Sequence, residues 1–121
     1  MALKHGGRWL EREDFGDVTV VRLHALRLDD DAMTRDLFGQ IDALIQEVGR
    51  RYLVLNLSSP EFLPSLAIGK LVLLNRRAQA AHGRLALSNL SRPTAEVLDA
   101  TQLAELFRIY GTEADAVRSF A

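Results

Sequence analysis

The sequence predicts a single α/β domain, in which a mixed β-sheet is covered by helices, over residues 1–121. Two observations support this prediction. Short apolar runs alternate along the chain with longer segments whose apolar residues have helical spacing, which is typical of strand–helix–strand crossovers. Two strand-like segments near the start are separated by Gly16-Asp17, a turn signal between antiparallel strands. The expected order of elements is ββαβαβαβα.

The antiparallel pair is expected at Trp9 to Phe15 and Val18 to Leu23. In the alternating part of the second strand, Arg22 and His24 are expected to face water. His24 is interpreted as a solvated residue, because no second His, Asp or Glu lies at a metal-ligand spacing from it.

The first helix is expected at Ala32 to Val48, directly after the acidic run Asp29-Asp30-Asp31. Carboxylates at this position can cap a helix and complement its dipole. A divalent cation is the alternative, but neither the glycine nor the distal glutamate of a calcium loop follows. Gly49 is expected to end the helix. The predicted buried face consists of Met33, Leu37, Ile41, Leu44, Ile45 and Val48.

The stretch from Tyr52 to Gln79 organises the rest of the chain. Tyr52 to Leu57 is apolar almost throughout, as expected for a central strand covered on both faces. The following helix, Leu66 to Ala81, has its buried positions at helical spacing, and His82-Gly83 closes it. On the strand, Leu53, Leu55 and Leu57 are expected to share one covered face, with Val54 buried on the other.

The last third of the chain continues the alternation. A buried strand is expected at Arg84 to Ser88, and a loop leads to a helix that begins at Thr94, a candidate cap. A short strand, Phe107 to Tyr110, and an amphipathic helix, Glu113 to Phe120, complete the prediction.

The loop from Ser58 to Ser65 is the predicted functional region, because sites of open α/β folds lie at the carboxyl ends of the strands. Ser65 stands at the start of a helix, where a hydroxyl can accept hydrogen bonds from the first turn. Residue type and position alone favour a simple N-cap. The helix dipole would also favour an added negative charge there.

Composition limits the classes of function. The chain has 48% hydrophobic and 26% charged residues. Its formal net charge of -1 does not indicate binding to nucleic acid or to an anionic membrane. Without cysteine it has no disulfide, thiolate metal site or cysteine nucleophile. No segment approaches the ~20 apolar residues needed to span a bilayer, and the first residues lack the apolar core of a signal peptide. A cytoplasmic protein without membrane insertion is expected.

The residues that could support catalysis are scattered. His5, His24 and His82 all lie outside the central loop, and no GxGxxG or phosphate-binding loop is present. The acid pairs Glu11 with Glu13 and Glu113 with Asp115 are interpreted as solvating charge. No catalytic residue, metal site or cofactor is therefore expected, and the protein is predicted not to be an enzyme.

Several segments along the chain carry a combined pattern: Tyr52 to Ser58, Glu61 to Gly69, Gly83 to Asn89, Val97-Leu98 and Leu103 to Tyr110. Together they resemble the STAS family, which includes the bacterial anti-sigma factor antagonists, and the similarity runs over nearly the whole chain. Its most specific part is an apolar strand, a short loop with an aromatic residue, and a serine that opens a helix with a glycine four residues later.

The resemblance implies a phosphorylated hydroxyl at this helix start, and Ser65 is the candidate. Phosphorylated members usually carry Asp-Ser-Ser-Gly, whereas this chain has Pro64-Ser65-Leu66-Ala67. Ser65 matches the first hydroxyl; if the second is the acceptor, it falls on Leu66 and no switch remains. Asn56 stands where the strand often has Asp.

The resemblance implies a regulatory domain that binds a protein, in that family an anti-sigma factor with a kinase fold. An alternative is a STAS-like subunit without a phosphoswitch in a larger assembly, such as a lipid-transport complex or a stress-signalling particle. A third, less favoured, is an enzyme or small-ligand binder that uses the same loop. The predicted partner-binding residues are Ser58, Ser59, Glu61, Pro64, Ser65, Leu66, Asn89 and Arg92.

Overall fold

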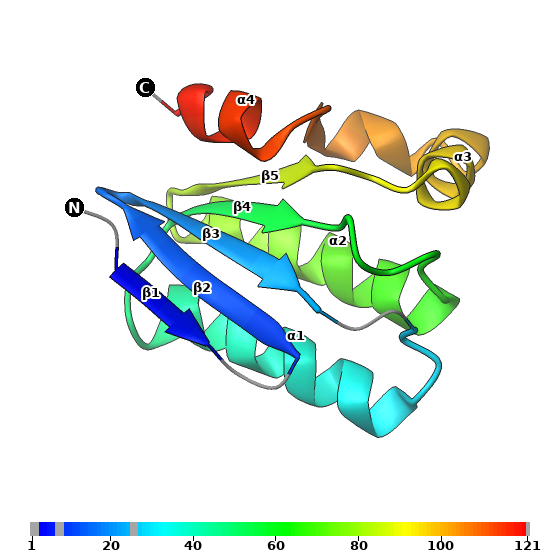
Figure 1. The fold of residues 1–121 in the computed structure, drawn as a ribbon, viewed down its shortest axis with the longest axis horizontal. Coiled ribbons are helices and arrows are strands. Elements are labelled where there is room, and N and C mark those ends of the chain that lie inside the picture. Colours follow the sequence, from blue (N-terminus) through cyan, green and yellow to red (C-terminus); the bar gives the residue numbers. More distant parts are fainter. Residues whose placement is uncertain (1–2, 7–8, 25–26, 121) are drawn as a thin grey trace.

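In the part of the chain that the structure describes, six strands form one mixed sheet in the order β1-β2-β3-β4-β5-β6 (Figure 1). The computed structural model describes residues 3–6, 9–24 and 27–120, with the backbone alone for residues 3–6. β1, β2 and β3 pair antiparallel, and β3, β4, β5 and β6 pair parallel. The strands are β1 (Leu3–Gly6), β2 (Leu10–Phe15), β3 (Val18–Leu23), β4 (Tyr52–Asn56), β5 (Arg84–Ser88) and β6 (Arg108–Tyr110).

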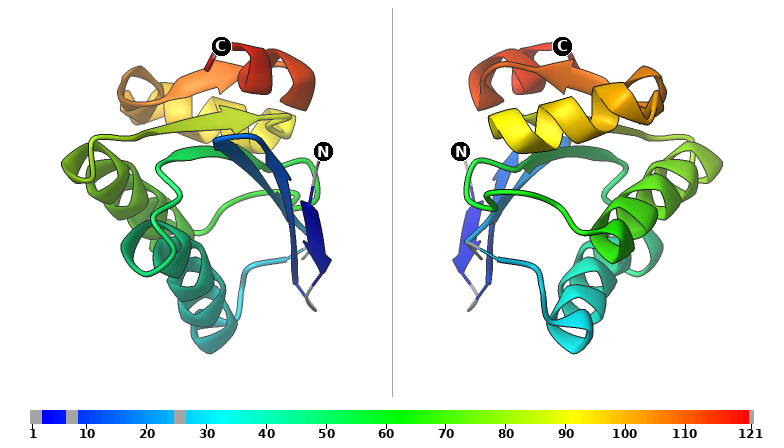
Figure 2. Two further views of the ribbon diagram at one scale, coloured as in Figure 1. Left: turned by 90° about the vertical axis from the view of Figure 1, so that its left-hand side faces the viewer. Right: turned by 90° about the vertical axis from the view of Figure 1, so that its right-hand side faces the viewer.

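Helices cover both faces of this sheet. α1 (Asp31–Gln46) and α2 (Ser65–Ala80) lie on one face, and the short α4 (Glu113–Arg118) lies on the other (Figure 2). α3 (Arg92–Ala100) is followed by a 3-10 helix, η1 (Leu103–Leu106), and its Leu98 joins the same core as α1 and α2. None of the described helices combines the length and apolarity needed to cross a bilayer.

The central strand divides its side chains between two cores, as predicted. Leu53 and Leu55 of β4, and Leu57 directly after the strand, belong to the larger core beneath α1 and α2. Val54 belongs to a smaller core that includes Ala116 of α4. Since β4 lies between β3 and β5, its central position is confirmed.

The ends of several elements differ from the expectation. β1 was not expected, and its four residues, Leu3–Gly6, are too few to show an alternating pattern. Asp30 caps α1 as predicted, with its carboxylate accepting a hydrogen bond from the Met33 amide at 3.1 Å. Val48 lies beyond the end of α1 and is 55% exposed, so its predicted place on the buried face is wrong.

Two predicted helix caps are also wrong. Pro64 is the N-cap of α2 and Ser65 is its first residue, so Ser65 does not cap the helix. α3 begins at Arg92 with Ser91 as the N-cap, and the expected cap, Thr94, is buried in the first turn. The proline of α3 explains the earlier start, because its fixed φ suits the first turn of a helix.

Candidate functional site

The loops after β4 and β5 meet at the carboxyl end of the parallel strands. Ser91 Oγ, just before α3, donates a hydrogen bond to the backbone oxygen of Glu61 at 2.7 Å. At the base of the loops, the Leu57 amide donates to the Ser88 carbonyl at 3.0 Å. The structure therefore joins the two segments from which the predicted site residues come.

The loop between β4 and α2 is anchored by some residues and exposes others. Pro60 and Leu63 are buried, whereas Ser58, Glu61 and Phe62 are exposed. Phe62 leaves 48% of its surface in contact with solvent, which is unusual for a large aromatic side chain. The loop thus presents an aromatic residue and a carboxylate from a fixed base.

Ser65 is exposed at the first position of α2. Within the described part of the chain, its hydroxyl has no hydrogen-bond partner, and the first turn of the helix contains no acidic residue. Leu66, next to it, is half-buried. An exposed hydroxyl at the positive end of a 16-residue helix is accessible to a modifying enzyme or to a partner.

The remaining predicted residues flank this helix start. Ser59 is half-buried in the β4–α2 loop. Asn89 follows β5 in a left-handed conformation (φ 58°), and its backbone N–H donates a hydrogen bond to the Tyr110 carbonyl at 3.3 Å. Arg92 is exposed and pairs with Glu96 at 3.1 Å. Asn89 and Arg92 thus lie on the neighbouring loop and helix, and among the described residues neither forms a hydrogen bond or ion pair with Ser65.

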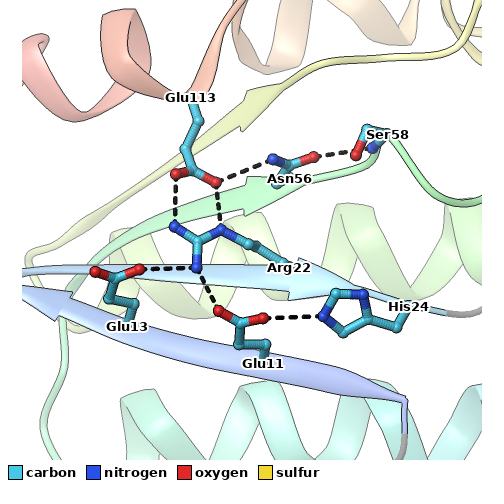
Figure 3. Close-up of polar contacts among 7 residues, drawn as sticks. All are labelled: Glu11, Glu13, Arg22, His24, Asn56, Ser58 and Glu113. Atoms are coloured by element: carbon cyan, nitrogen blue, oxygen red, sulfur yellow. Dashed lines mark hydrogen bonds and ion pairs between the residues drawn. The ribbon is translucent and has the colours of Figure 1, made fainter. Parts of the chain in front are cut away.

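A group of charged residues at the start of α4 was not identified from the sequence. Arg22 of β3 donates from Nε and Nη2 to the two carboxylate oxygens of Glu113, at 2.8 and 2.7 Å (Figure 3). Its Nη1 lies 2.6 Å from Glu11 Oε2 and 2.8 Å from Glu13 Oε1. We call Glu11, Glu13, Arg22 and Glu113 the Arg22 cluster. His24 lies beside it, with Nε2 at 3.2 Å from Glu11 Oε1.

Asn56 connects the Arg22 cluster to the candidate binding loop. Its Nδ2 donates to Glu113 Oε1 at 3.0 Å, and its Oδ1 accepts from the Ser58 amide at 3.0 Å (Figure 3). A side-chain amide can donate and accept at once, whereas an aspartate here would place a second carboxylate against Glu113. Asparagine at this position therefore fits a glutamate at the start of α4.

The ion pair between Arg22 and Glu113 favours the charged form of both side chains. Hydrogen bonds from Arg22 hold the pKa of Glu113 below its usual value, and hydrogen bonding to Glu113 raises the pKa of Arg22. The side chains of Glu11, Glu13, Arg22 and Glu113 are each about one-fifth exposed, at 17%, 19%, 22% and 22%. The predictions that Arg22 faces water and that these glutamates are solvating charge are therefore wrong, whereas His24 and Asp115 are exposed.

The described residues contain no group of three or more His, Asp or Glu side chains that could hold a metal ion. The three glutamates of the Arg22 cluster surround a guanidinium rather than an open site. Its chemistry is that of a structural ion-pair network.

Comparison with solved structures shows the fold. The anti-sigma factor antagonist SpoIIAA in its unphosphorylated form is 22% identical, with a TM-score of 0.76 over 92% of this chain and 95% of SpoIIAA. The phosphorylated form of SpoIIAA, described as a Bacillus cell fate determinant, is 20% identical, with a TM-score of 0.72 over 93% of this chain and 99% of that one.

Two further structures are similar. An anti-sigma-factor antagonist (STAS) domain protein from Planctomyces limnophilus is 23% identical, with a TM-score of 0.75 over 91% of this chain and 96% of that one. SLC26A9 is 14% identical, with a TM-score of 0.62 over 86% of this chain but only 20% of its own. The same fold thus occurs in small proteins and as part of a much larger one.

Sequence comparison with curated proteins gives no significant match. The family model for the STAS domain matches residues 13–116, which include α1, α2, α3 and the β4–α2 loop. The match covers most of the 121 residues, and the chain therefore belongs to the STAS domain family.

Proposed function

We propose that this domain is a non-catalytic regulatory module that binds a protein partner at the carboxyl end of its sheet. The observation that carries the proposal is the exposed hydroxyl of Ser65 at the start of α2, next to an anchored loop with an exposed Phe62. We call the proposed contact region the loop surface. It consists of Ser58, Ser59, Glu61, Pro64, Ser65, Leu66, Asn89 and Arg92.

In its specific form, the proposal is that the protein is a cytoplasmic anti-sigma factor antagonist whose partner is an anti-sigma factor with a kinase fold. The structural likeness to SpoIIAA, which is described as an anti-sigma factor antagonist and is known in a phosphorylated form, supports this choice. Phosphorylation of Ser65 would then switch the interaction.

The position of Ser65 is suited to such a switch. A phosphate would add roughly -1.5 to -2 charges. The dipole of α2 favours negative charge at this end, and the first turn has no other acid to oppose it. The fold would tolerate the phosphate. A partner packed on the loop surface would clash with the phosphate group, and binding would require the removal of water from its charged oxygens. Binding would weaken without unfolding.

A second candidate is a STAS-like subunit without a phosphoswitch, within a transport or stress-signalling assembly. The flanking residues favour it, because Pro64 restricts the backbone before Ser65 and Leu66 is half-buried where a second hydroxyl would stand. The similarity to part of SLC26A9 supports the idea that this fold works inside larger proteins. An enzyme or small-ligand binder is less favoured, since the loop surface offers no paired acid and base.

The test begins with affinity capture from the source cells by the parent protein, followed by titration of the purified partner. Ser65→Ala should bind at least as tightly as the parent. Ser65→Asp should bind more weakly without a fall in melting temperature. Equal binding by both variants would support the module without a phosphoswitch, and mass spectrometry of the native protein would show whether Ser65 is modified.

A further inference from the structure

A hollow of about 110 Å³ lies between α1 and α2, and none of its lining residues belongs to the loop surface. Its floor is apolar, because Phe38 and Leu74 are both buried. Leu73 also lines it and is 41% exposed, so an apolar side chain remains open to solvent at the groove. The full lining is Arg35, Phe38, Gly39, Asp42, Lys70, Leu73, Leu74 and Arg77.

The rim of this groove is basic, although the whole chain has a net charge of -1. It carries three cationic side chains and one carboxylate. Arg77 Nη1 lies 3.1 Å from Asp42 Oδ2, so that pair is internally neutralised. Among the described residues, neither Arg35 nor Lys70 has an ion-pair partner. Two uncompensated cations thus face an apolar hollow.

Gly39 keeps the hollow open on the α1 side. A β-carbon placed on it would meet no atom within 4 Å, although glycine inside a helix costs stability relative to alanine. Because Gly39 lines the hollow, we expect a larger side chain at this position to narrow it.

The size of the hollow decides what kind of ligand fits. At about 110 Å³ it is well below the ~300–1,000 Å³ of pockets that enclose small molecules and cofactors. It has room for one or two apolar side chains. The lining comes from about two turns of each helix, residues 35–42 of α1 and 70–77 of α2, so a third helix can be placed against them, and the charge of the rim suits an acidic one.

We propose that the groove between α1 and α2 docks an acidic amphipathic helix of a protein partner. One apolar side chain enters the hollow over Phe38 and Leu74, and carboxylates on either side pair with Arg35 and Lys70. This surface does not include Ser65, so it serves a partner whether or not Ser65 is a switch.

The probe is a synthetic 16-residue helical peptide with two leucines one turn apart and glutamates beside them on the same face. Its control replaces the glutamates with glutamine. Titration of the glutamate peptide into the ¹⁵N-labelled full chain should shift the amide signals of Arg35, Gly39, Lys70 and Leu73. The glutamate peptide should bind more tightly than the glutamine control, and the difference should be largest at low salt. The double variant Arg35→Glu/Lys70→Glu should bind about tenfold more weakly. The control for each single substitution, Arg35→Glu or Lys70→Glu, is Arg76→Glu, which makes the same charge change at an exposed α2 residue outside the groove lining and should bind like the parent.

A filling variant separates binding from folding. Gly39→Met should abolish peptide binding while the melting temperature holds or rises. Failure of the glutamate peptide to bind at about 1 mM, signals that shift elsewhere, or unchanged affinity of the double variant would overturn the proposal. Binding of phosphatidylglycerol vesicles in place of the peptide, with the same dependence on Arg35 and Lys70, would overturn it in favour of a membrane surface.

Discussion

Arg22 and Glu113 are 91 residues apart in the chain, yet their side chains form a two-point ion pair with distances of 2.8 and 2.7 Å. The pair fixes the start of α4 against β3. A helix of six residues is too short to be stable alone, so its position depends on such contacts and on Ala116 in the smaller core. Through Asn56, the same carboxylate is linked to the loop surface.

Removal of the Arg22 guanidinium should destabilise the protein more than removal of the Glu113 charge. Arg22→Met leaves Glu11, Glu13 and Glu113 close together without a cation, and we expect a loss of about 2–3 kcal/mol. Glu113→Gln keeps the other two pairs and should cost about 1 kcal/mol. Both values come from denaturant unfolding.

The control for these variants lies on the same helix. The ion pair between Arg118 and Asp115 has side chains that are 71% and 52% exposed, so Arg118→Met should change stability by less than about 0.5 kcal/mol. Equal losses for Arg22→Met and Arg118→Met would mean that the Arg22 cluster does not stabilise the fold.

Acid should weaken the fold through the same cluster. Hydrogen bonds from Arg22 lower the pKa of Glu113 from 4.5, so its stabilising contribution is complete above the unfolded-state pKa. That contribution is lost as the pH falls through the folded-state pKa. The stability difference between the parent and Glu113→Gln should therefore be constant from about pH 7 to 5 and shrink below about pH 4.

The Glu113→Gln variant should itself remain sensitive to acid. Burial opposes ionisation of Asp14, but hydrogen bonds from Arg12 and Thr19 lower its pKa overall. The ionised Asp14 therefore also stabilises the fold, and this contribution is lost as the pH falls. A difference between parent and variant that grows toward pH 3 would contradict the assignment to Glu113.

The sequence predicted the sheet interior well because β4 carries its pattern locally. Alternation along Tyr52–Asn56, together with its apolar composition, was enough to place Leu55 and Val54 on opposite covered faces. Helix starts were predicted less well. A serine or threonine near a start can cap it or lie inside it, and Pro93 rather than Thr94 decided where α3 begins.

One contact of the Arg22 cluster could have been predicted from the sequence. The Gly16-Asp17 turn pairs Phe15 with Val18, and that register places Glu11 opposite Arg22. The predicted hairpin thus contained the signal for one ion pair. No local pattern could bring in Glu113, because its approach depends on how α4 packs across β3 and β4.

The buried central strand gives a direct test of the core. Leu55 is 1% exposed, and Leu55→Ala should cost about 2–5 kcal/mol in denaturant unfolding. Leu106→Ala removes the same atoms at a position that is 51% exposed and should cost less than about 1 kcal/mol. A loss below about 0.5 kcal/mol for Leu55→Ala would contradict the central place of β4.

Two glycines should respond to the same substitution with opposite signs. Gly39→Ala places a methyl group in open space within α1 and should stabilise the protein by about 0.5–1 kcal/mol. At Gly83 a β-carbon would lie 2.1 Å from the Arg51 backbone oxygen, so Gly83→Ala should destabilise by more than about 1 kcal/mol. Thermal melts measure both changes, and a stable Gly83→Ala would show that the β4 and β5 starts can move apart.

Charge at the start of α2 should change stability according to its sign, independently of any partner. Ser65 is the first residue of the helix, and the first turn contains no acid. Ser65→Asp should therefore stabilise the protein by about 0.3–1 kcal/mol, while Ser65→Lys should destabilise it by a similar amount. Ser65→Ala, which has no charge, is the reference in thermal melts at low ionic strength.

The salt dependence of these melts distinguishes the dipole from a local contact. Added salt screens an exposed charge, so the difference between Ser65→Asp and Ser65→Lys should shrink as ionic strength rises. Loss of stability in Ser65→Asp at low salt would mean that the helix start does not accept negative charge. The proposed phosphate on Ser65 would then disturb the fold itself, and weaker partner binding by Ser65→Asp would no longer indicate a switch at the loop surface.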